Sequence, residues 1–272
     1  MCTVLGVARS TYYKSFDKTK SAREIENEEL KAAIIRIYKS NKGIYGAPRI
    51  HYILSTEGFT VSLKRVQRKI SELGLYAITV KKYKPHSNKK VKDGLKNVLK
   101  RDFTTTSINQ KWVGDITYIH TTQDGWCYLA SILDLYSKKI IGYAFGKKMT
   151  DDLVIKALKR AYYNQNPHKD NKLIFHSDLG SQYTSNDLKD LCKEFSIVQS
   201  FSKKGCPYDN ACIESFHSSI KKEEVYRNTY RTFEEAKIAI FKYIEGWYNR
   251  RRLHSAINYM TPEQCELSAR SV

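Results

Sequence analysis

The sequence lacks the long hydrophobic runs of a membrane protein. No stretch of its 272 residues approaches the roughly 18 consecutive apolar residues of a spanning helix. Nor does the chain open with the charged segment, apolar segment and cleavage site of a secretory signal. We therefore expect a cytoplasmic protein without a membrane partner.

Clustered metal and disulfide ligands are missing as well. The six cysteines lie far apart with no C-x-x-C pair, and the seven histidines are equally scattered. This distribution argues against a disulfide framework. No zinc is expected, because a structural zinc site needs Cys and His side chains clustered at short spacings.

Acidic residues are scarce relative to basic ones. The chain holds 28 Asp and Glu against 47 Lys and Arg, for a formal net charge of +19. Such a surplus predicts a polyanionic partner, and nucleic acid is favoured over a membrane surface. The surplus is uneven, because residues 1–103 hold 23 basic and 9 acidic side chains, whereas residues 104–272 hold 24 and 19. We therefore expect two parts with different functions to follow one another along the chain, and we expect the first third to bind DNA.

The first third has the pattern of a small helical DNA-binding domain. Apolar residues recur at helical spacing over residues 22–38, a second helix fits residues 49–55, and Ser62 caps a third that ends at Gly74. In the third helix an apolar stripe is opposed by four basic residues, Lys64, Arg65, Arg68 and Lys69. This arrangement is typical of a helix-turn-helix module whose last helix enters the major groove. The alternative is an ordinary solvated helix face.

Two flanking segments complete this part of the chain. Residues 5–13 resemble the turn and recognition helix of another such motif, so we interpret residues 1–20 as a partial helix-turn-helix and residues 21–80 as the complete domain. Eight lysines lie between residues 81 and 101 with little apolar periodicity. Residues 81–103 are therefore interpreted as a basic linker, suited to lie along phosphates or to act as a tether.

From residue 104 the pattern changes to that of an α/β domain. Three short-linked strands, over residues 112–121, 126–135 and 139–145, predict an antiparallel meander. The next elements are helix 151–164, strand 173–176, helix 185–195, strand 197–201, and helices 211–226 and 232–249. The predicted order is βββαβαβαα in a domain of residues 104–265, followed by a tail of residues 266–272.

Three carboxylates stand at positions that favour chemistry. Asp115 lies inside an apolar strand, where an unpaired charge is costly. Asp178 ends a strand and precedes Gly180, and Glu214 lies one turn into a helix. Cutting or joining a phosphodiester uses two divalent metals held by such acids. Each acid alone also has a structural explanation, as an edge residue, a turn cap or a complement to a helix N-terminus.

The motifs around these acids are similar to those of a known enzyme family. In their order and in the spacing of the three acids, the segments WxxDITY at 112–118, HSDxGSQY at 176–183 and DNAxxESF at 209–216 resemble the DDE transposases of bacterial insertion sequences, in the retroviral-integrase superfamily. Further matches are YGxxRI at 45–50 and WYNxxRxHSA at 247–256. The resemblance implies an α/β, RNase H-like catalytic domain behind a small all-α helix-turn-helix domain. It also implies that Asp115, Asp178 and Glu214 bind two Mg²⁺ ions, with Mn²⁺ as a substitute.

Other basic residues are candidate DNA contacts. Lys221, seven residues after Glu214 on the same helical face, matches a position that contacts DNA in integrase-like enzymes, although a plain surface lysine explains it equally well. Arg250, Arg251 and Arg252 form a basic cluster suited to phosphates. The neighbouring aromatic residues at 247 and 248 either stack on bases or pack on the sheet.

Three polar residues near the acids receive structural roles. His176 is expected to be a satisfied histidine at a strand end, and Asp134 is expected to be structural. Asn210 is expected to cap the helix that carries Glu214.

The resemblance implies a transposase that depends on Mg²⁺, cleaves at the ends of a mobile DNA element and joins the freed 3′-hydroxyl to a target strand. Its DNA partners would be terminal repeats and target DNA at the bacterial nucleoid, with a homo-oligomer formed because two ends must be held together. Family members usually begin with an upstream-frame segment, so we expect this chain to be the downstream product and the upstream-frame product to be a further partner. A DNA-binding regulator without catalysis, or a structure-selective nuclease of the same fold, are the alternative interpretations.

Overall fold

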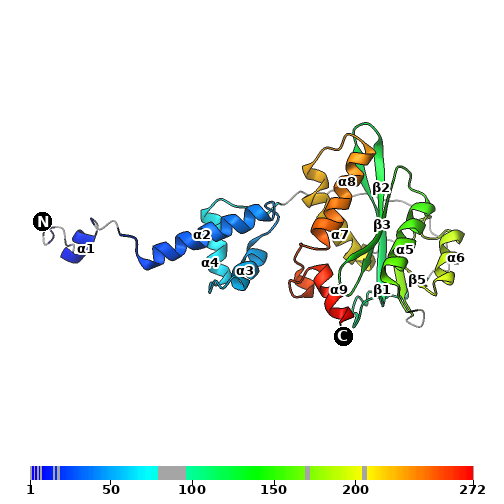
Figure 1. Cartoon of the computed structure of the whole chain (residues 1–272), viewed down its shortest axis with the longest axis horizontal. Coiled ribbons are helices and arrows are strands. Elements are labelled where there is room, and N and C mark those ends of the chain that lie inside the picture. The colour runs from blue at the N-terminus through cyan, green and yellow to red at the C-terminus, as the bar shows by residue number, and fades with distance from the viewer. Residues whose placement is uncertain are drawn as a thin grey trace. The chain divides into compact units, whose positions relative to one another are not determined.

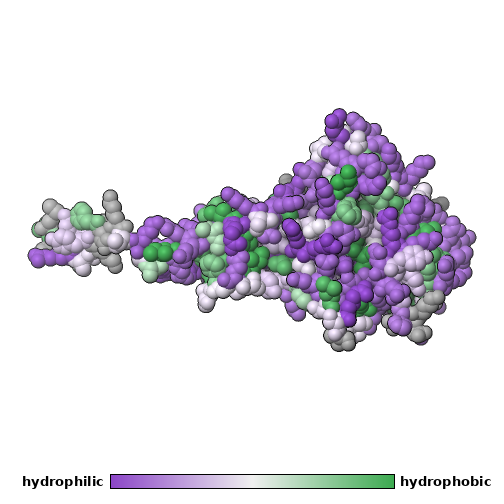
Figure 2. All heavy atoms as spheres, viewed as in Figure 1, coloured by the Kyte–Doolittle hydropathy of each residue, from purple (hydrophilic) through white to green (hydrophobic). Residues whose placement is uncertain are grey.

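The computed structural model of the chain describes residues 2, 4, 6, 8–14, 16, 19–78, 96–168, 172–203 and 207–271. The chain divides into two compact units, Met1–Ile78 and Thr79–Val272. Within these described ranges, no helix is both long and apolar enough to cross a membrane. Figure 2 shows hydrophilic side chains over much of the visible surface of each unit.

The first unit is built on three helices, as the sequence predicts. They are α2 (Ala22–Ser40), α3 (Ala47–Thr56) and α4 (Leu63–Glu72), preceded by a short helix α1 (Arg9–Lys14). The side chains of Ser21 and Ser62 cap α2 and α4 by accepting backbone N–H groups. Ile34, Ile50 and Val66, one from each helix, are fully buried between them. Contacts between apolar stripes therefore hold this unit together.

The second unit is built on a five-stranded sheet with the order β3-β2-β1-β4-β5. Its strands are β1 (Lys111–Thr121), β2 (Gly125–Asp134), β3 (Ile140–Gly146), β4 (Ile174–Ser177) and β5 (Val198–Phe201). The first three form the predicted antiparallel meander, β4 pairs parallel to β1, and β5 pairs parallel to β4. β1 has 11 residues and β4 has 4, so the later half of β1 extends past its pairing with β4.

Helices cover both faces of this sheet (Figure 1). α5 (Asp151–Gln165) and α6 (Asn186–Glu194) lie on one face, and α7 (Ala211–Glu223) and α8 (Phe233–Phe241) lie on the other. α5 packs so closely on β3 that a Cβ atom at Gly142 would lie 2.4 Å from the carbonyl oxygen of Ala157. The main hydrophobic core lies between α5, α6 and the sheet, with Trp112 and Phe175 among its largest side chains. This mixed α/β architecture agrees with the predicted fold class.

The C-terminal elements differ from the prediction. The helix expected over 211–226 ends at Glu223 and is followed by the 3₁₀ turn η2 (Val225–Arg227). The helix expected over 232–249 is α8 followed by a π-helix, η3 (Lys242–Tyr248). A short 3₁₀ turn, η4 (Ser255–Ile257), comes after it. Most of the expected tail belongs to α9 (Pro262–Arg270), in which Glu266 is buried and paired with Lys139. This pairing explains why the segment is ordered rather than loose.

The predicted basic linker is docked at its end. Residues 81–95 lie outside the described residues, whereas residues 96–101, the anchor segment, belong to the second unit and run against β5. The Phe201 N–H of β5 donates to the Lys96 carbonyl at 3.1 Å, and the N–H of Leu99 donates to the Ser200 hydroxyl at 2.9 Å. At its end, Arg101 pairs at 2.5 Å with the buried Asp209 of the 3₁₀ turn η1 (Pro207–Asn210), just before α7.

Candidate active site

The pairing of β1 with β4 leads Asp115 and Asp178 to the same end of the β1–β4 ladder. β1 and β4 pair in parallel with Val113 opposite His176, and Asp115 and Asp178 each follow this last pair by two residues. Adjacent strands lie about 4.8 Å apart. Asp178 follows the carboxyl end of β4, where α/β sheets commonly bind ligands. Two acids that are far apart in the chain therefore come together near the carboxyl end of β4.

Backbone N–H groups fix one oxygen of each aspartate. Oδ1 of Asp115 accepts the N–H of Ile116 at 2.8 Å, and Oδ1 of Asp178 accepts the N–H of Gly180 at 2.9 Å. The Asp115 side chain is 23% exposed and Asp178 is more open. Both carboxylates are thus oriented by the chain while part of each faces solvent.

α7 brings Glu214 to the same region. Glu214 lies in the first turn of α7 with an exposed side chain. Desolvation and then the negative charge of Asp115 raise the pKa of Glu214, and His217 lowers it. Burial raises the pKa of Tyr183 well above its ordinary value, and the charges of Asp115 and Asp178 raise it further. The three acids therefore interact electrostatically, either with one another or with a common neighbour. A cation bound among them would relieve the repulsion between their negative charges.

The three acids suit a hard divalent cation in kind. They supply only carboxylate oxygens, which are the ligands that Mg²⁺ and Mn²⁺ prefer. In the described part of the chain, however, no three His, Cys, Asp or Glu side chains come close enough together to form a complete metal site. The acids therefore match such a cation in chemistry, whereas their side-chain positions do not by themselves form a complete set of ligands.

Asn210 does not cap α7 in the way that the sequence suggests, and that prediction is wrong. It occupies the N-cap position, but its side chain makes no cap hydrogen bond. Instead Nδ2 donates to the carbonyl of Gly114 at 3.2 Å. Oδ1 of Asn210 is buried, with no hydrogen-bond partner among the described residues. Asn210 thus ties the start of α7 to β1, one residue before Asp115.

His217 is the neighbour of the acids that sequence reasoning missed. It lies three residues after Glu214 on the same face of α7 and is 7% exposed. Nδ1 lies 3.4 Å from Oδ2 of Asp115, and Nε2 lies 2.8 Å from Oγ of Ser131 on β2. The available signal was a histidine one helical turn after a candidate acid.

Lys221 lies in the same environment. Burial lowers the pKa of Lys221, and the negative charge of Asp115 raises it in part. Its ammonium group is therefore within electrostatic reach of the acids, as expected for a residue on the Glu214 face of α7. DNA contact by Lys221 stays a prediction.

The three arginines predicted to form one basic cluster are separated. Arg250 and Arg251 are exposed, whereas Arg252 is 8% exposed. Arg252 forms a buried ion pair with Glu223 of α7, with Nη2 and Oε1 2.8 Å apart. This burial keeps the Arg252 guanidinium from the surface on which a phosphate would meet it, so the structure replaces its predicted DNA contact with a packing role.

Further side chains complete this buried network. The carboxylate of Glu223 also accepts the Tyr243 hydroxyl at 2.8 Å and the Trp247 indole N–H at 3.1 Å. Trp247 and Tyr248 are both buried. The aromatic residues at 247 and 248 therefore pack inside the protein, and the network ties the end of α7 to η3.

The basic residues of α4 also divide into two kinds. Lys64 and Arg68 are exposed and, within the described residues, pair with no acid. Arg65 donates to Glu26 of α2 at 2.8 Å, and Lys69 pairs with an acid one turn along its own helix. In the part of the chain that the structure describes, Lys64 and Arg68 are thus the basic residues of this helix without an intramolecular ion pair.

His176 and Asp134 have the structural roles that the sequence indicates. Nδ1 of His176 bonds to the Ser200 hydroxyl at 2.8 Å and Nε2 to the Ser202 hydroxyl at 3.0 Å. Burial lowers the pKa of His176 to about 4. Asp134 is buried and accepts both the N–H and the hydroxyl of Ser137. Both residues are therefore satisfied inside the fold.

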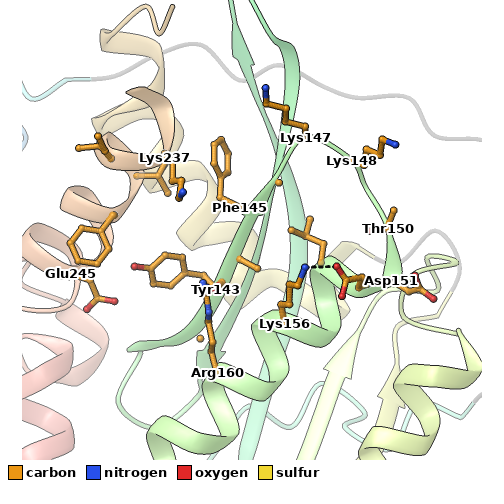
Figure 3. A pocket seen from close by; sticks show the side chains of 18 of the residues that line it. Tyr143, Phe145, Lys147, Lys148, Thr150, Asp151, Lys156, Arg160, Lys237 and Glu245 are labelled. Carbon is orange, nitrogen blue, oxygen red and sulfur yellow. Dashed lines mark hydrogen bonds and ion pairs between the residues drawn. The ribbon is translucent and has the colours of Figure 1, made fainter. Parts of the chain in front are cut away.

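A large cleft lies elsewhere in the second unit, along the open edge of β3 between α5 and α8 (Figure 3). It has a volume of about 1310 Å³, an aromatic wall that includes Tyr143 and Phe145, and lysines such as Lys147 and Lys156. None of the three acids lines it. Because phosphodiester chemistry needs the carboxylates, we place the candidate site at β1, β4 and α7 instead.

Comparison with family models covers both units. A model described as an integrase core domain matches residues 105–207, and a second of the same description matches residues 196–262. A model of an HTH-like domain matches residues 24–83. Among solved structures, the HTLV-2 integrase catalytic core domain in complex with magnesium is 17% identical, with a TM-score of 0.44 over 58% of this chain and 96% of that chain.

Two curated relatives match over nearly the whole chain. Transposase InsF for insertion sequence IS3A of Escherichia coli strain K12 is 36% identical over 98% of this chain and 92% of that protein. The transposase for insertion sequence element IS904 of Lactococcus lactis is 37% identical over 90% of this chain and 96% of that protein. This chain therefore belongs to the transposases of insertion sequences with an integrase core domain, which are polynucleotidyl transferases that move DNA.

Proposed function

We propose that this transposase cleaves DNA at the ends of its mobile element and joins the freed 3′-hydroxyl to a target strand, with Asp115, Asp178 and Glu214 as ligands of two Mg²⁺ ions. The strand pairing supports this most directly, because Asp115 and Asp178 each follow the last β1–β4 pair by two residues, and α7 carries Glu214 into the field of Asp115. Bound divalent ions would supply an activated nucleophile and stabilise charge on the phosphate and the leaving oxygen. Mn²⁺ would substitute, because it prefers the same oxygen ligands.

Two displacements at phosphorus make up the reaction. In cleavage, a water oxygen bonds to phosphorus while the bond from phosphorus to the bridging 3′-oxygen breaks, and that oxygen takes up a proton. In transfer, the freed 3′-hydroxyl loses its proton and bonds to a target phosphorus, releasing a target 3′-hydroxyl. Neither step needs a covalent link between protein and DNA.

The chain's own groups would orient the acids and the DNA. The N–H groups of Ile116 and Gly180 hold one oxygen of each aspartate and so fix the direction in which each carboxylate would meet a ligand. The Lys221 ammonium, which is under the influence of the Asp115 charge, would contact a phosphate bound beside the acids.

The remaining basic residues and partners belong to DNA handling. Lys64 and Arg68 would contact phosphates of the terminal repeats, and the exposed Arg250 and Arg251 would add charge to the catalytic unit. We further propose that the protein acts as a homo-oligomer on DNA, together with an upstream-frame product, at the nucleoid in the bacterial cytoplasm.

The test uses the full chain, labelled ends of its own element, target DNA, and Mg²⁺, Mn²⁺ or a chelator. We expect cleaved and joined products only with metal. Asp115→Asn, Asp178→Asn and Glu214→Gln should abolish both steps while DNA binding persists, whereas Asp190→Asn, at an exposed acid of α6, should change neither. Strand transfer that survives Asp178→Asn would refute the proposed ligands. A wild-type chain that binds the element ends without cutting them would favour the alternative interpretation, a DNA-binding regulator without catalysis.

A further inference from the structure

His217 stands between α7 and β1, two of the three elements that position the acids. It projects from α7, the helix of Glu214, to Asp115 on β1 at 3.4 Å and to Ser131 on β2 at 2.8 Å. Asp115 and Ser131 are direct partners in the β1–β2 register. One buried ring therefore connects α7 with both central strands.

The chemistry of its neighbours assigns a direction to each contact. At 3.4 Å the carboxylate of Asp115 faces Nδ1 closely enough to repel a ring lone pair there, so the hydrogen of a neutral ring is favoured on Nδ1. A serine hydroxyl donates or accepts, so Ser131 can serve Nε2 in either form of the ring. The second contact thus holds the ring with Nδ1 toward the aspartate.

Asp115 is oriented from two sides as a result. Ile116 N–H fixes Oδ1 at 2.8 Å, and the His217 ring faces Oδ2. A carboxylate on a strand otherwise turns about two side-chain torsions, and a metal ligand loses affinity when its orientation is not held.

We propose that His217 is a positioning residue, which presents an Nδ1–H to Oδ2 of Asp115 and so sets both the orientation of that carboxylate and its distance from Glu214. The proposal rests on the proposed function, in which Asp115 is a metal ligand. The coupling to Glu214 follows because His217 and Glu214 share one face of α7 at a spacing of three residues.

Two variants separate this role from simple packing. His217→Asn keeps an N–H near the position of Nδ1, whereas His217→Leu keeps apolar volume and removes the donor. The first readout is Mn²⁺ affinity of the full chain, from the electron paramagnetic resonance signal of free Mn²⁺. Loss of a group that supports a metal ligand typically weakens binding by about 10–100-fold, so we expect that loss for His217→Leu and a loss of less than about 5-fold for His217→Asn. Wild-type affinity in His217→Leu, or equal losses in both variants, would overturn the proposal.

A second readout needs neither metal nor mutation at the histidine. Two-bond ¹⁵N–¹H correlations in the metal-free protein should show the neutral His217 ring protonated at Nδ1, and Ser131→Ala should weaken that preference. A neutral ring protonated at Nε2 alone would contradict the proposal, even if His217→Leu fails to fold. Asp115→Asn tests separately whether Asp115 is a metal ligand. Mn²⁺ affinity that survives this change would refute that role of Asp115 but would leave the contact with His217 unaffected.

Discussion

Replacing Glu223 by alanine is expected to destabilise the second unit strongly. Its carboxylate is 9% exposed and accepts hydrogen bonds from Arg252, Tyr243 and Trp247 at 2.8 to 3.1 Å. Without Glu223, the buried guanidinium of Arg252 loses the carboxylate that balances its charge, and the Tyr243 hydroxyl and the Trp247 indole N–H lose this acceptor. The change therefore leaves an uncompensated charge inside the protein.

The size of the loss follows from the burial of the pair. Removing one partner of a buried ion pair costs about 3–5 kcal/mol, which at about 2–4 °C per kcal/mol lowers Tm by about 6–20 °C in a domain of this size. Replacing both Glu223 and Arg252 by leucine should recover most of the loss, because the pair also carries a large desolvation cost.

Tryptophan fluorescence during heating is the assay. All three tryptophans, Trp112, Trp126 and Trp247, lie in the second unit, so the signal reports that unit alone. Arg250→Ala, at the exposed neighbour, is the control and should shift Tm by less than about 2 °C. A Glu223→Ala protein that unfolds within about 2 °C of wild type would refute the reasoning.

Other expectations follow from single contacts. His176 has a folded pKa of about 4 because of burial, below the ordinary 6.5 of the unfolded chain. As the pH falls, the unfolded state therefore takes up the proton first. The contribution of His176 to the free energy of unfolding is complete above pH 6.5 and is lost as the pH falls toward 4. Urea unfolding across that range checks this, and His176→Gln should show a smaller acid loss. Lys64→Ala and Arg68→Ala should each weaken DNA binding and reduce the slope of log affinity against log salt by about 1, measured by fluorescence anisotropy; an unchanged slope would remove that residue from the interface. Gly142→Ala should lower Tm, since its Cβ would meet the Ala157 carbonyl at 2.4 Å, and an unchanged Tm would contradict so close an approach.

Local pattern singled out two of the acids as candidates, and the family resemblance made the three acids a set. Asp115 interrupts an apolar strand and Asp178 follows one, and the antiparallel meander follows from short turns between β-rich runs. The parallel register that joins the two aspartates has no local signal, because β1 and β4 are separated along the chain by β2, β3 and α5 and meet only through packing.

The residues that sequence reasoning misplaced have distant partners. Asn210 bonds to Gly114, 96 residues away, and so does not serve its own helix. Arg252 stands in a run of three arginines typical of a surface, but Glu223, 29 residues earlier, takes it into the interior. A hydrogen-bond or ion-pair partner that the fold brings from far along the chain thus decides the role of such a residue, and the neighbouring sequence does not show that partner.

The anchor segment limits the length of DNA that one molecule can span. Lys96 is fixed to β5 and Ile78 ends the first unit, so the chain between these two residues sets the reach of one unit from the other. A fully extended chain spans at most about 3.3–3.6 Å per residue, so these two attachment points stand no more than about 60–65 Å apart. At about 3.4 Å per base pair, this tether spans no more than about 18–19 base pairs of straight duplex. Under the proposed function, in which the first unit reads DNA and the second cuts it, a recognition sequence farther from the cut than this tether and the two units can span would be read by one molecule and cut by another.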